Sequence, residues 1–111
     1  MAAKEEIIEE LQKFMTKLQN EEYSRHVRGW NKTMQYYFTD TNEYYSIKLV
    51  NGVPQGLSQG QVEKPEISYQ MNSDDYLALS RGEIKGLKLY NSGRLKIKAS
   101  MPDIIKLQKL E

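Results

Sequence analysis

Hydrophobic residues recur every three or four positions near the start of the chain and predict an amphipathic helix from Lys4 to Leu18. Four glutamates open this segment, where their charge suits the positive end of the helix dipole. We expect the apolar side of the helix to pack on the core of the domain rather than to bind a partner. The residues of this side are Ile7, Ile8, Leu11, Phe14, Met15 and Leu18.

A strand-like composition rich in Tyr, Phe, Ile and Val follows over residues 33–50. Its apolar positions alternate, and Thr41-Asn42 interrupts the alternation, so we predict two strands joined by a turn. Asn51-Gly52 comes next and favours a type I′ hairpin turn, because both residues tolerate positive φ. The core-facing residues expected on the two strands are Met34, Tyr36, Phe38, Tyr45, Ile47 and Leu49.

The next two predicted strands differ in regularity. The third should return through Leu57 and Val62, but the proline and glycines along it favour an edge position, a bend or a bulge. Residues 65–71 alternate clearly and predict a fourth strand. Its inner face is expected to carry Ile67, Tyr69 and Met71.

A pair of short helices is predicted after the fourth strand. Ser73 is a suitable N-cap, and Gly82 can adopt the left-handed conformation that ends a helix. A second helix should span Glu83 to Asn91 and end at Gly93.

The last third of the chain predicts a strand and a helix. Strict alternation from Arg94 to Lys98 gives a strand whose outer face is basic. Ser100-Met101-Pro102-Asp103 has the spacing of a capping box, so a helix should run to about Leu110. Its apolar residues spread over about 220° of the helical wheel, more than one covered surface needs. Two interpretations stay open, a lid over a cavity and a terminal helix that contacts another copy.

Length and composition set the broad class. The 111 residues indicate one domain, residues 1–111, and the order of predicted elements indicates an α+β fold. The first ten residues are acidic, and no apolar run is long enough to span a bilayer. We therefore expect a cytoplasmic protein.

Candidate catalytic chemistry is sparse. The chain has no cysteine and one histidine, which excludes disulfides, thiolate metal sites and multi-histidine zinc sites. His26 has cationic neighbours and no orienting carboxylate, and the adjacent Asp74 and Asp75 point about 100° apart on a helix. Phosphate-binding loops and nucleophile motifs are missing from the sequence. We expect no catalytic residue, no metal and no cofactor.

Charge and tyrosine are distributed unevenly along the chain. The formal net charge is +1, but residues 81–111 hold eight Lys and Arg against three Asp and Glu. Six of the eight tyrosines lie in or beside the predicted sheet, where they could line an apolar pocket, although strand propensity also explains them. Lys48 is the lone cation near these tyrosines, so we expect no nucleic-acid partner.

Three motifs follow one another in the second half of the chain. They are Asn51-Gly52 after a strand, Ser73-Asp74-Asp75-Tyr76-Leu77-Ala78-Leu79 before Gly82, and Ser92-Gly93-Arg94-Leu95-Lys96-Ile97-Lys98 before Met101 and the helix over 104–110. In this order and spacing the chain from Tyr44 onward resembles the sterol carrier protein 2 family of lipid-transfer domains.

The resemblance implies a five-stranded, mostly antiparallel sheet with helices packed on one face. These elements would enclose an apolar tunnel for sterols, fatty acids, acyl-CoAs or phospholipids, and the family has no catalytic residues to carry over. The chain departs from the family pattern at Ala99-Ser100, where Gly followed by Asp or Asn is common, and in the short connection between Gly82 and Gly93.

Together, the apolar last helix and the resemblance predict a non-enzymatic lipid-binding domain with a cavity between sheet and helices. The alternative is a protein–protein interaction or dimerisation module, including a weak homodimer, that uses the last helix without a small ligand. The residues expected to bind the lipid are Ile47, Leu49, Ile67, Tyr69, Tyr76, Leu77, Leu87, Tyr90, Leu95, Ile97, Met101, Ile104, Ile105 and Leu107.

The basic C-terminal third suggests how such a domain would load its lipid. Lys106 and Lys109 lie opposite the apolar arc of the last helix, and each cation near an anionic surface contributes about 1 kcal/mol to binding. We expect a transient contact with anionic membranes through these lysines, with Met101, Ile104 and Leu110 entering the surface.

Overall fold

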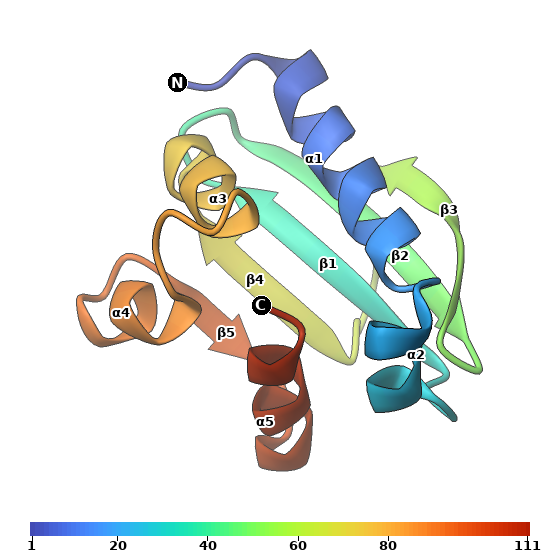
Figure 1. Ribbon diagram of the computed structural model, residues 1–111. Coiled ribbons are helices and arrows are strands. Elements are labelled where there is room, and N and C mark those ends of the chain that lie inside the picture. Colours follow the sequence, from blue (N-terminus) through green and yellow to red (C-terminus); the bar gives the residue numbers. More distant parts are fainter.

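The computed structural model describes all residues from Met1 to Glu111 and contains one sheet and five helices (Figure 1). The strand order is β3-β2-β1-β4-β5, with β1 and β4 parallel and every other neighbouring pair antiparallel. The predicted α+β fold with a five-stranded, mostly antiparallel sheet is therefore confirmed. The elements are α1 (Lys4–Lys17), α2 (Glu21–Val27), β1 (Lys32–Phe38), β2 (Glu43–Val50), β3 (Val53–Gln59), β4 (Ile67–Met71), α3 (Ser73–Ser80), α4 (Gly86–Asn91), β5 (Lys96–Lys98) and α5 (Met101–Lys109).

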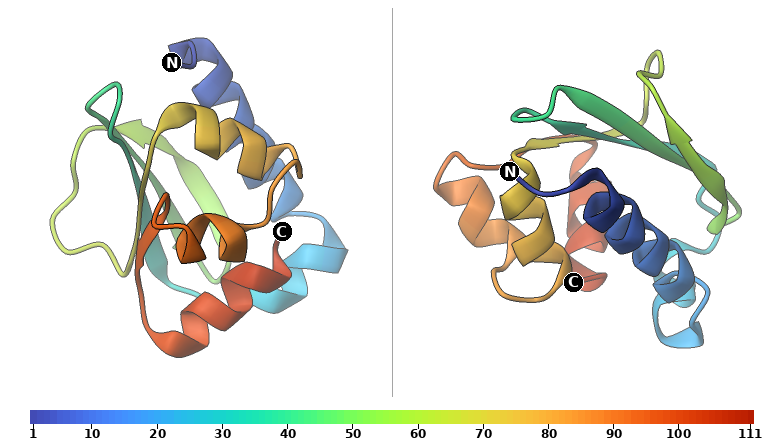
Figure 2. Two further views of the ribbon diagram at one scale, coloured as in Figure 1. Left: turned by 90° about the vertical axis from the view of Figure 1, so that its left-hand side faces the viewer. Right: turned by 90° about the horizontal axis from the view of Figure 1, so that it is seen from above.

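All five helices lie on one face of the sheet, as two perpendicular views show (Figure 2). The loop between β3 and β4 lies on the opposite face, where the backbone N–H of Val62 donates to the Gln35 side chain. The molecule thus has a helix-covered inner face and a largely polar outer face.

Side-chain alternation along the central strands builds the core. Met34, Tyr36 and Phe38 on β1 are almost fully buried, and Met34 and Tyr36 pair in register with Ile47 and Tyr45 on β2. Their neighbours in sequence point to the outer face, as expected from the two-residue period of a strand. The inner-face positions predicted for β1 and β2 are therefore confirmed.

The Asn51-Gly52 turn is docked against the chain that follows α2. Asn51 and Gly52 have φ values of 50° and 77°, consistent with the predicted I′ hairpin turn. The Asn51 Oδ1 accepts a hydrogen bond from the Gly29 N–H at 2.8 Å, and the Gly52 N–H donates to the Trp30 carbonyl at 2.8 Å. A Cβ at Gly52 would lie 2.5 Å from the Val27 carbonyl oxygen, so only glycine fits this approach.

One element of the first half of the chain has no predicted counterpart, and one prediction is wrong. Residues 20–32 have no clear hydrophobic period, but α2 forms there with Asn20 as its N-cap. Only Val27 of this helix is buried, so it has no apolar stripe for a periodicity search to detect. The third strand ends at Gln59 and does not reach Val62, because the chain then crosses to the outer face of the sheet.

The cap of α3 also differs from the prediction. Asn72 is the N-cap and accepts the N–H of Asp75, whereas Ser73 is fully buried within the helix. The Ser73 Oγ and backbone N–H both donate to the Asp40 carboxylate, and the Ser73 Oγ accepts the backbone N–H of Ala2. Ser73 therefore ties the start of α3 to the β1–β2 turn and to the N-terminus.

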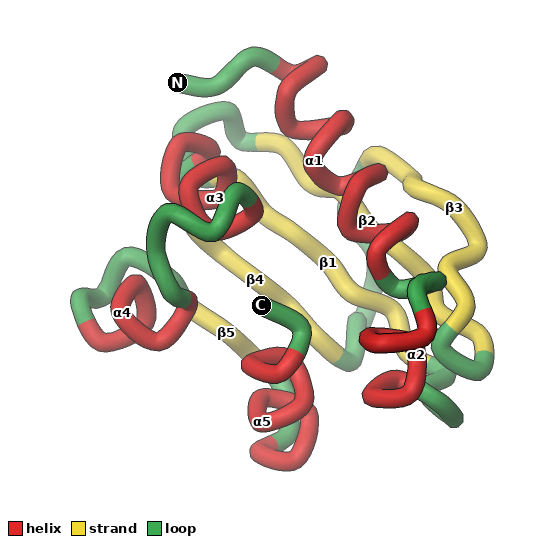
Figure 3. The backbone as a smooth tube through the Cα atoms, viewed as in Figure 1, coloured by secondary structure: helices red, strands yellow, loops and turns green.

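The elements on both sides of Gly93 are shorter than predicted. Helix α4 begins at Gly86 rather than Glu83, and β5 contains only three residues between α4 and α5 (Figure 3). Gly82 and Gly93 adopt positive φ after α3 and α4, as the sequence predicted. Ser100 caps α5 through the Asp103 N–H.

We expect Gly52→Ala to lower the free energy of unfolding by about 2–4 kcal/mol, because alanine there combines positive φ with a clash against Val27. Gly29→Ala is the matched control, since Gly29 also has positive φ but has open space around it. Its cost should be about 1 kcal/mol. Urea unfolding of both variants measures the difference, and equal losses would contradict the role of the close contact.

Candidate functional site

A pocket of about 520 Å³ lies between the inner face of the sheet and the helices α1, α3, α4 and α5. Tyr36 on β1, Tyr69 on β4 and Ile97 on β5 form part of its sheet side. A sealed, dry void of this size would cost on the order of 12 kcal/mol, comparable to the whole stability of a domain. The pocket must therefore hold water or a ligand.

Nine of the fourteen residues predicted to bind a ligand line this pocket. They come from β4, β5 with the residue before it, and the three helices α3, α4 and α5, so the structure brings together positions that are far apart in the sequence. The nine are Tyr69, Tyr76, Leu87, Tyr90, Leu95, Ile97, Met101, Ile104 and Leu107.

The other five predicted residues lie elsewhere. Ile47 and Leu49 are buried on β2, in the region of the sheet that α1 covers (Figure 1). Ile67 and Leu77 also belong to the closed apolar core, and Ile105 is half exposed to solvent. Alternation identified the inner face of the sheet correctly but did not show which part of that face a helix would cover.

Several residues of the pocket wall were not predicted. Phe14 and Lys17 reach it from α1, and Leu79 and Ile84 from the region around the end of α3. Phe14 belonged to the predicted apolar stripe of α1, but the stripe alone does not show that one end of it borders a pocket. Tyr36 is one of the six sheet tyrosines that could line a pocket, but it is not among the fourteen predicted ligand residues, because its position beside Tyr69 depends on the parallel pairing of β1 with β4.

Three tyrosine rings form one side of the pocket. The Tyr36 and Tyr69 rings are stacked with centroids 5.0 Å apart, and the Tyr76 ring meets Tyr36 edge-on at 5.6 Å. Burial raises the pKa of all three hydroxyls well above the usual value. The hydroxyls therefore stay protonated and remain hydrogen-bond donors at physiological pH.

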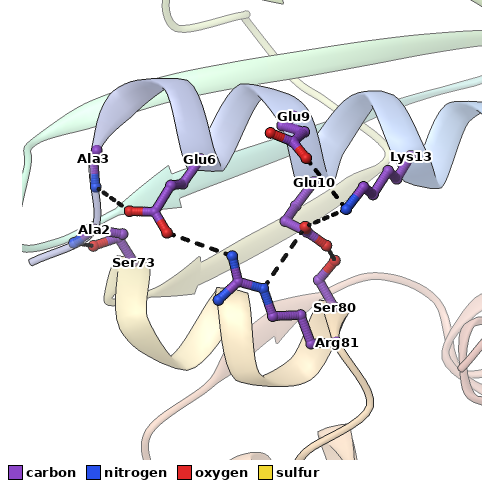
Figure 4. A network of polar contacts seen from close by, with 9 residues as sticks. All are labelled: Ala2, Ala3, Glu6, Glu9, Glu10, Lys13, Ser73, Ser80 and Arg81. Carbon is purple, nitrogen blue, oxygen red and sulfur yellow. Dashed lines mark hydrogen bonds and ion pairs between the residues drawn. The ribbon is translucent and has the colours of Figure 1, made fainter.

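A polar network on the pocket wall joins α1 to the end of α3 (Figure 4). Its centre is the buried Glu10 carboxylate, which accepts hydrogen bonds from the Ser80 Oγ at 2.7 Å and the Lys13 Nζ at 3.2 Å. The Arg81 Nε lies 3.7 Å from the same carboxylate, and Arg81 also pairs with Glu6. Burial alone would raise the pKa of Glu10, but these bonds and charges outweigh it and lower the pKa.

Two further polar contacts position the C-terminal elements. The Lys32 Nζ at the start of β1 donates to the buried Asp103 of α5. The backbone N–H of Gly86 at the start of α4 donates to the Glu111 carboxylate at 2.7 Å. The first contact joins α5 to the sheet, and the second joins the start of α4 to the residue at the end of the chain.

Arg94 differs from the other two basic residues on the outer face of the predicted strand, because it is paired with an acidic side chain. Its guanidinium binds both oxygens of the buried Asp75 carboxylate on α3. This contact raises the pKa of Arg94 and joins α3 to the segment before β5. Lys96 and Lys98 are exposed, as the alternation predicted.

The residues expected to contact a membrane surface differ from one another in exposure. Leu110 is 3% exposed and therefore belongs to the core, whereas Met101 is 66% exposed. The Lys106 Nζ lies 5.6 Å from the centre of the Trp30 ring, and Lys109 is exposed. Of the two lysines predicted to contact a membrane, Lys109 is therefore the more accessible.

Neither a metal site nor a membrane span is evident in the fold. No three His, Asp or Glu side chains converge as metal ligands, and His26 on α2 does not border the pocket. None of the five helices combines the length and apolar character needed to cross a bilayer.

Comparison with known proteins gives a family match over most of the chain. Residues 11–111 match the model of the SCP-2 sterol transfer family. The crystal structure of sterol carrier protein 2 like 2 from Aedes aegypti has a TM-score of 0.72 at 14% identity, and the match covers 96% of each chain. The palmitated form of that protein in solution has a TM-score of 0.71 at 16% identity, covering 98% of this chain and 94% of that one. No curated protein sequence gave a significant match.

The same fold also occurs as a part of larger enzymes. The inverting sec-alkylsulfatase from a Pseudomonas species matches with a TM-score of 0.64 at 16% identity, over 78% of this chain. This chain spans only 13% of the length of that sulfatase. At such identities the likeness shows a shared fold only.

We expect Glu10→Gln to lower the free energy of unfolding at pH 7 by about 1.5–3 kcal/mol, because the charged hydrogen bonds to Ser80 and Lys13 are lost. Because folding lowers the pKa of Glu10, its contribution is present above the usual value of about 4.3 and is lost as the pH falls toward the folded pKa. Stability curves between pH 3 and 7 should therefore be flatter for Glu10→Gln than for the parent.

Glu9→Gln serves as the control for this experiment, because Glu9 is exposed and pairs only with Lys13. Its stability should stay within about 1 kcal/mol of the parent at every pH. Parallel pH curves for Glu10→Gln and the parent would contradict the role of Glu10.

Proposed function

The chain belongs to the SCP-2 sterol transfer family, and we propose that it binds one lipid molecule in the pocket between the sheet and helices α1, α3, α4 and α5. The observation that carries this proposal is the pocket itself. Its volume lies in the range of small-molecule sites, and most of its lining residues are hydrophobic.

The composition of the pocket wall supports an amphipathic ligand. Apolar side chains such as Phe14, Leu95 and Leu107 line the interior, while Lys17 and Lys85 also border it. An alkyl chain would gain about 25 cal/mol for each Å² of apolar surface removed from water. The palmitated Aedes aegypti neighbour shows that this fold accommodates an acyl group in another member.

We further propose that the domain binds or transfers its lipid without catalysing a reaction. The pocket contains no histidine or serine–histidine pair, and its one buried acid, Glu10, is held by Ser80, Lys13 and Arg81. These contacts lower the pKa of Glu10, which makes its carboxylate a weaker general base.

Loading is proposed to occur where the pocket reaches the surface between α4 and α5. Leu87 and Met101 line the pocket and are 54% and 66% exposed, so apolar side chains meet solvent there. Lys85 and Lys109 are both exposed. The hydrogen bond from the Gly86 N–H to the Glu111 carboxylate brings the segments that carry them together. Apolar side chains beside cations fit transient contact with an anionic membrane.

Contact between two copies through α5 is the second candidate, and the half-exposed Ile105 favours it. Light scattering across a range of protein concentrations distinguishes a dimer from a monomeric carrier. A monomer that binds lipid would support the pocket as the functional surface.

Ile104→Trp should lower the affinity for a fluorescent fatty acid by tenfold or more, because the larger ring would occupy the pocket that Ile104 borders. Ile105→Trp is the matched control on the next residue of α5, outside the pocket wall, and should bind normally. Fluorescence titration and native mass spectrometry measure the bound lipid. Equal binding by both variants would overturn the proposed site.

Lys85→Glu/Lys109→Glu should reduce binding to anionic vesicles by about tenfold or more at low salt, since two cations become anions at the proposed contact surface. Lys48→Glu, on the exposed outer side of β2, is the control and should have a much smaller effect. Flotation with neutral and anionic vesicles at low and high salt tests this. Unchanged flotation of the double variant would place loading elsewhere.

A further inference from the structure

We propose that the hydroxyls of Tyr36 and Tyr69, which lie beside the Tyr76 ring, select lipids that carry a neutral oxygen acceptor, such as an alcohol or a ketone, over lipids with an ionised carboxylate. This inference rests on the proposed lipid-binding function of the pocket. It assigns the chemistry of the group that the ligand places against the three rings.

The fold fixes the three tyrosines as one rigid group. Tyr36 and Tyr69 occupy paired positions on the parallel strands β1 and β4, and their rings are within 4° of parallel. Tyr76 reaches the same place from α3. All three residues line the pocket, and Tyr36 and Tyr76 are each only 4% exposed.

Two hydroxyls of this group lack the hydrogen-bond partners that the hydroxyls of Tyr37 and Tyr45 have. The Tyr37 hydroxyl donates to Asn42 at 2.8 Å, whereas those of Tyr36 and Tyr69 make no hydrogen bond. The Tyr76 hydroxyl differs, because the Ser80 side chain is its hydrogen-bond partner and Ser80 in turn donates to Glu10. The unpaired hydroxyls of the group are therefore those of Tyr36 and Tyr69.

These unpaired hydroxyls are open to the pocket rather than sealed in the core. The Thr41 Oγ1 is the one fully enclosed side-chain polar atom without a hydrogen-bond partner, so the unpaired hydroxyls of Tyr36 and Tyr69, two residues of the pocket lining, are not fully enclosed. Buried donors are normally satisfied, by protein, water or ligand. An oxygen atom of a ligand would complete the hydrogen bonding of the group.

The surrounding charges favour a neutral acceptor. The negative charge of Glu10 acts on Tyr76 and that of Glu111 acts on Tyr69, both in the direction that opposes a further negative charge. Lys13 and Arg81, the cations nearest to Glu10 in its network, are already paired with glutamates. A carboxylate would therefore meet two acidic side chains without a free cation.

An ionised head group has a better position at the pocket rim. Lys17 and Lys85 border the pocket and make no salt bridge within the protein. A fatty acid would therefore leave its carboxylate near these lysines with its chain inward. The oxygen of a ketone or an alcohol would lose less hydration free energy than a carboxylate when it is buried against the tyrosines.

The test uses two ligands of equal chain length, 2-hexadecanone and palmitate, in competition with a fluorescent fatty acid. Tyr36→Phe and Tyr69→Phe each remove one hydroxyl and keep the ring. We expect each variant to bind 2-hexadecanone about threefold to tenfold more weakly, the usual effect of one hydrogen bond, and palmitate within twofold of the parent. Tyr37→Phe, on the outer face of the sheet, should change neither affinity.

Two further measurements separate ligand recognition from folding. The Tyr36→Phe and Tyr69→Phe variants should have an unchanged or higher Tm without ligand, because each removes an unpartnered hydroxyl. The carbonyl stretching band of bound 2-hexadecanone should lie at lower frequency in the parent than in either variant, since a hydrogen bond weakens the C=O bond.

The outcomes of this experiment are distinguishable. Equal weakening of ketone and palmitate, or no weakening of ketone with an unshifted carbonyl band, would overturn the tyrosine site while leaving lipid binding intact. Failure of the parent to bind either lipid or the fluorescent probe would overturn the proposed function, and the tyrosine site with it.

Discussion

The parallel pairing of β1 with β4 is the constraint on which the rest of the structure depends. It places two strands that are distant in sequence at the centre of the sheet, with the β2–β3 hairpin on one side and β5 on the other. Parallel neighbours cannot be joined by a tight turn, so the chain needs a longer crossover. That crossover passes the outer face, where Gln35 accepts the Val62 N–H, and the inner face is left to the helices.

The helices divide this inner face into two unequal regions. Helix α1 packs on α3 and toward β3, and the closed apolar core forms beneath it. The short elements α3, α4 and α5 surround β4 and β5 without filling the space between them. Polar contacts support this open arrangement, notably Glu10 with Ser80, Lys32 with Asp103 and the Gly86 N–H with Glu111. These contacts hold the pocket wall where apolar packing is incomplete.

The elements predicted correctly from the sequence are those with a strong local signal. The α1 stripe, the alternation of β1 and β2 and the Asn51-Gly52 turn depend on neighbouring residues only, and all three are confirmed. Helix α2 was missed because only Val27 is buried, and the cap of α3 was assigned to Ser73 because Asp40, its distant partner, is not visible in the local pattern. Long-range contacts therefore account for the errors in the fold.

The same distinction applies to the candidate site. Periodicity placed Ile47 and Tyr69 on the inner face with equal weight, yet only Tyr69 borders the pocket. What separates them is the position of α1 over the sheet, which no local pattern encodes. Tyr36 shows the converse, because a residue that looks like an ordinary core tyrosine in the sequence becomes part of the pocket once β4 lies beside it. The pocket is thus a property of the strand order, and its chemistry is set by the residues that this order brings together.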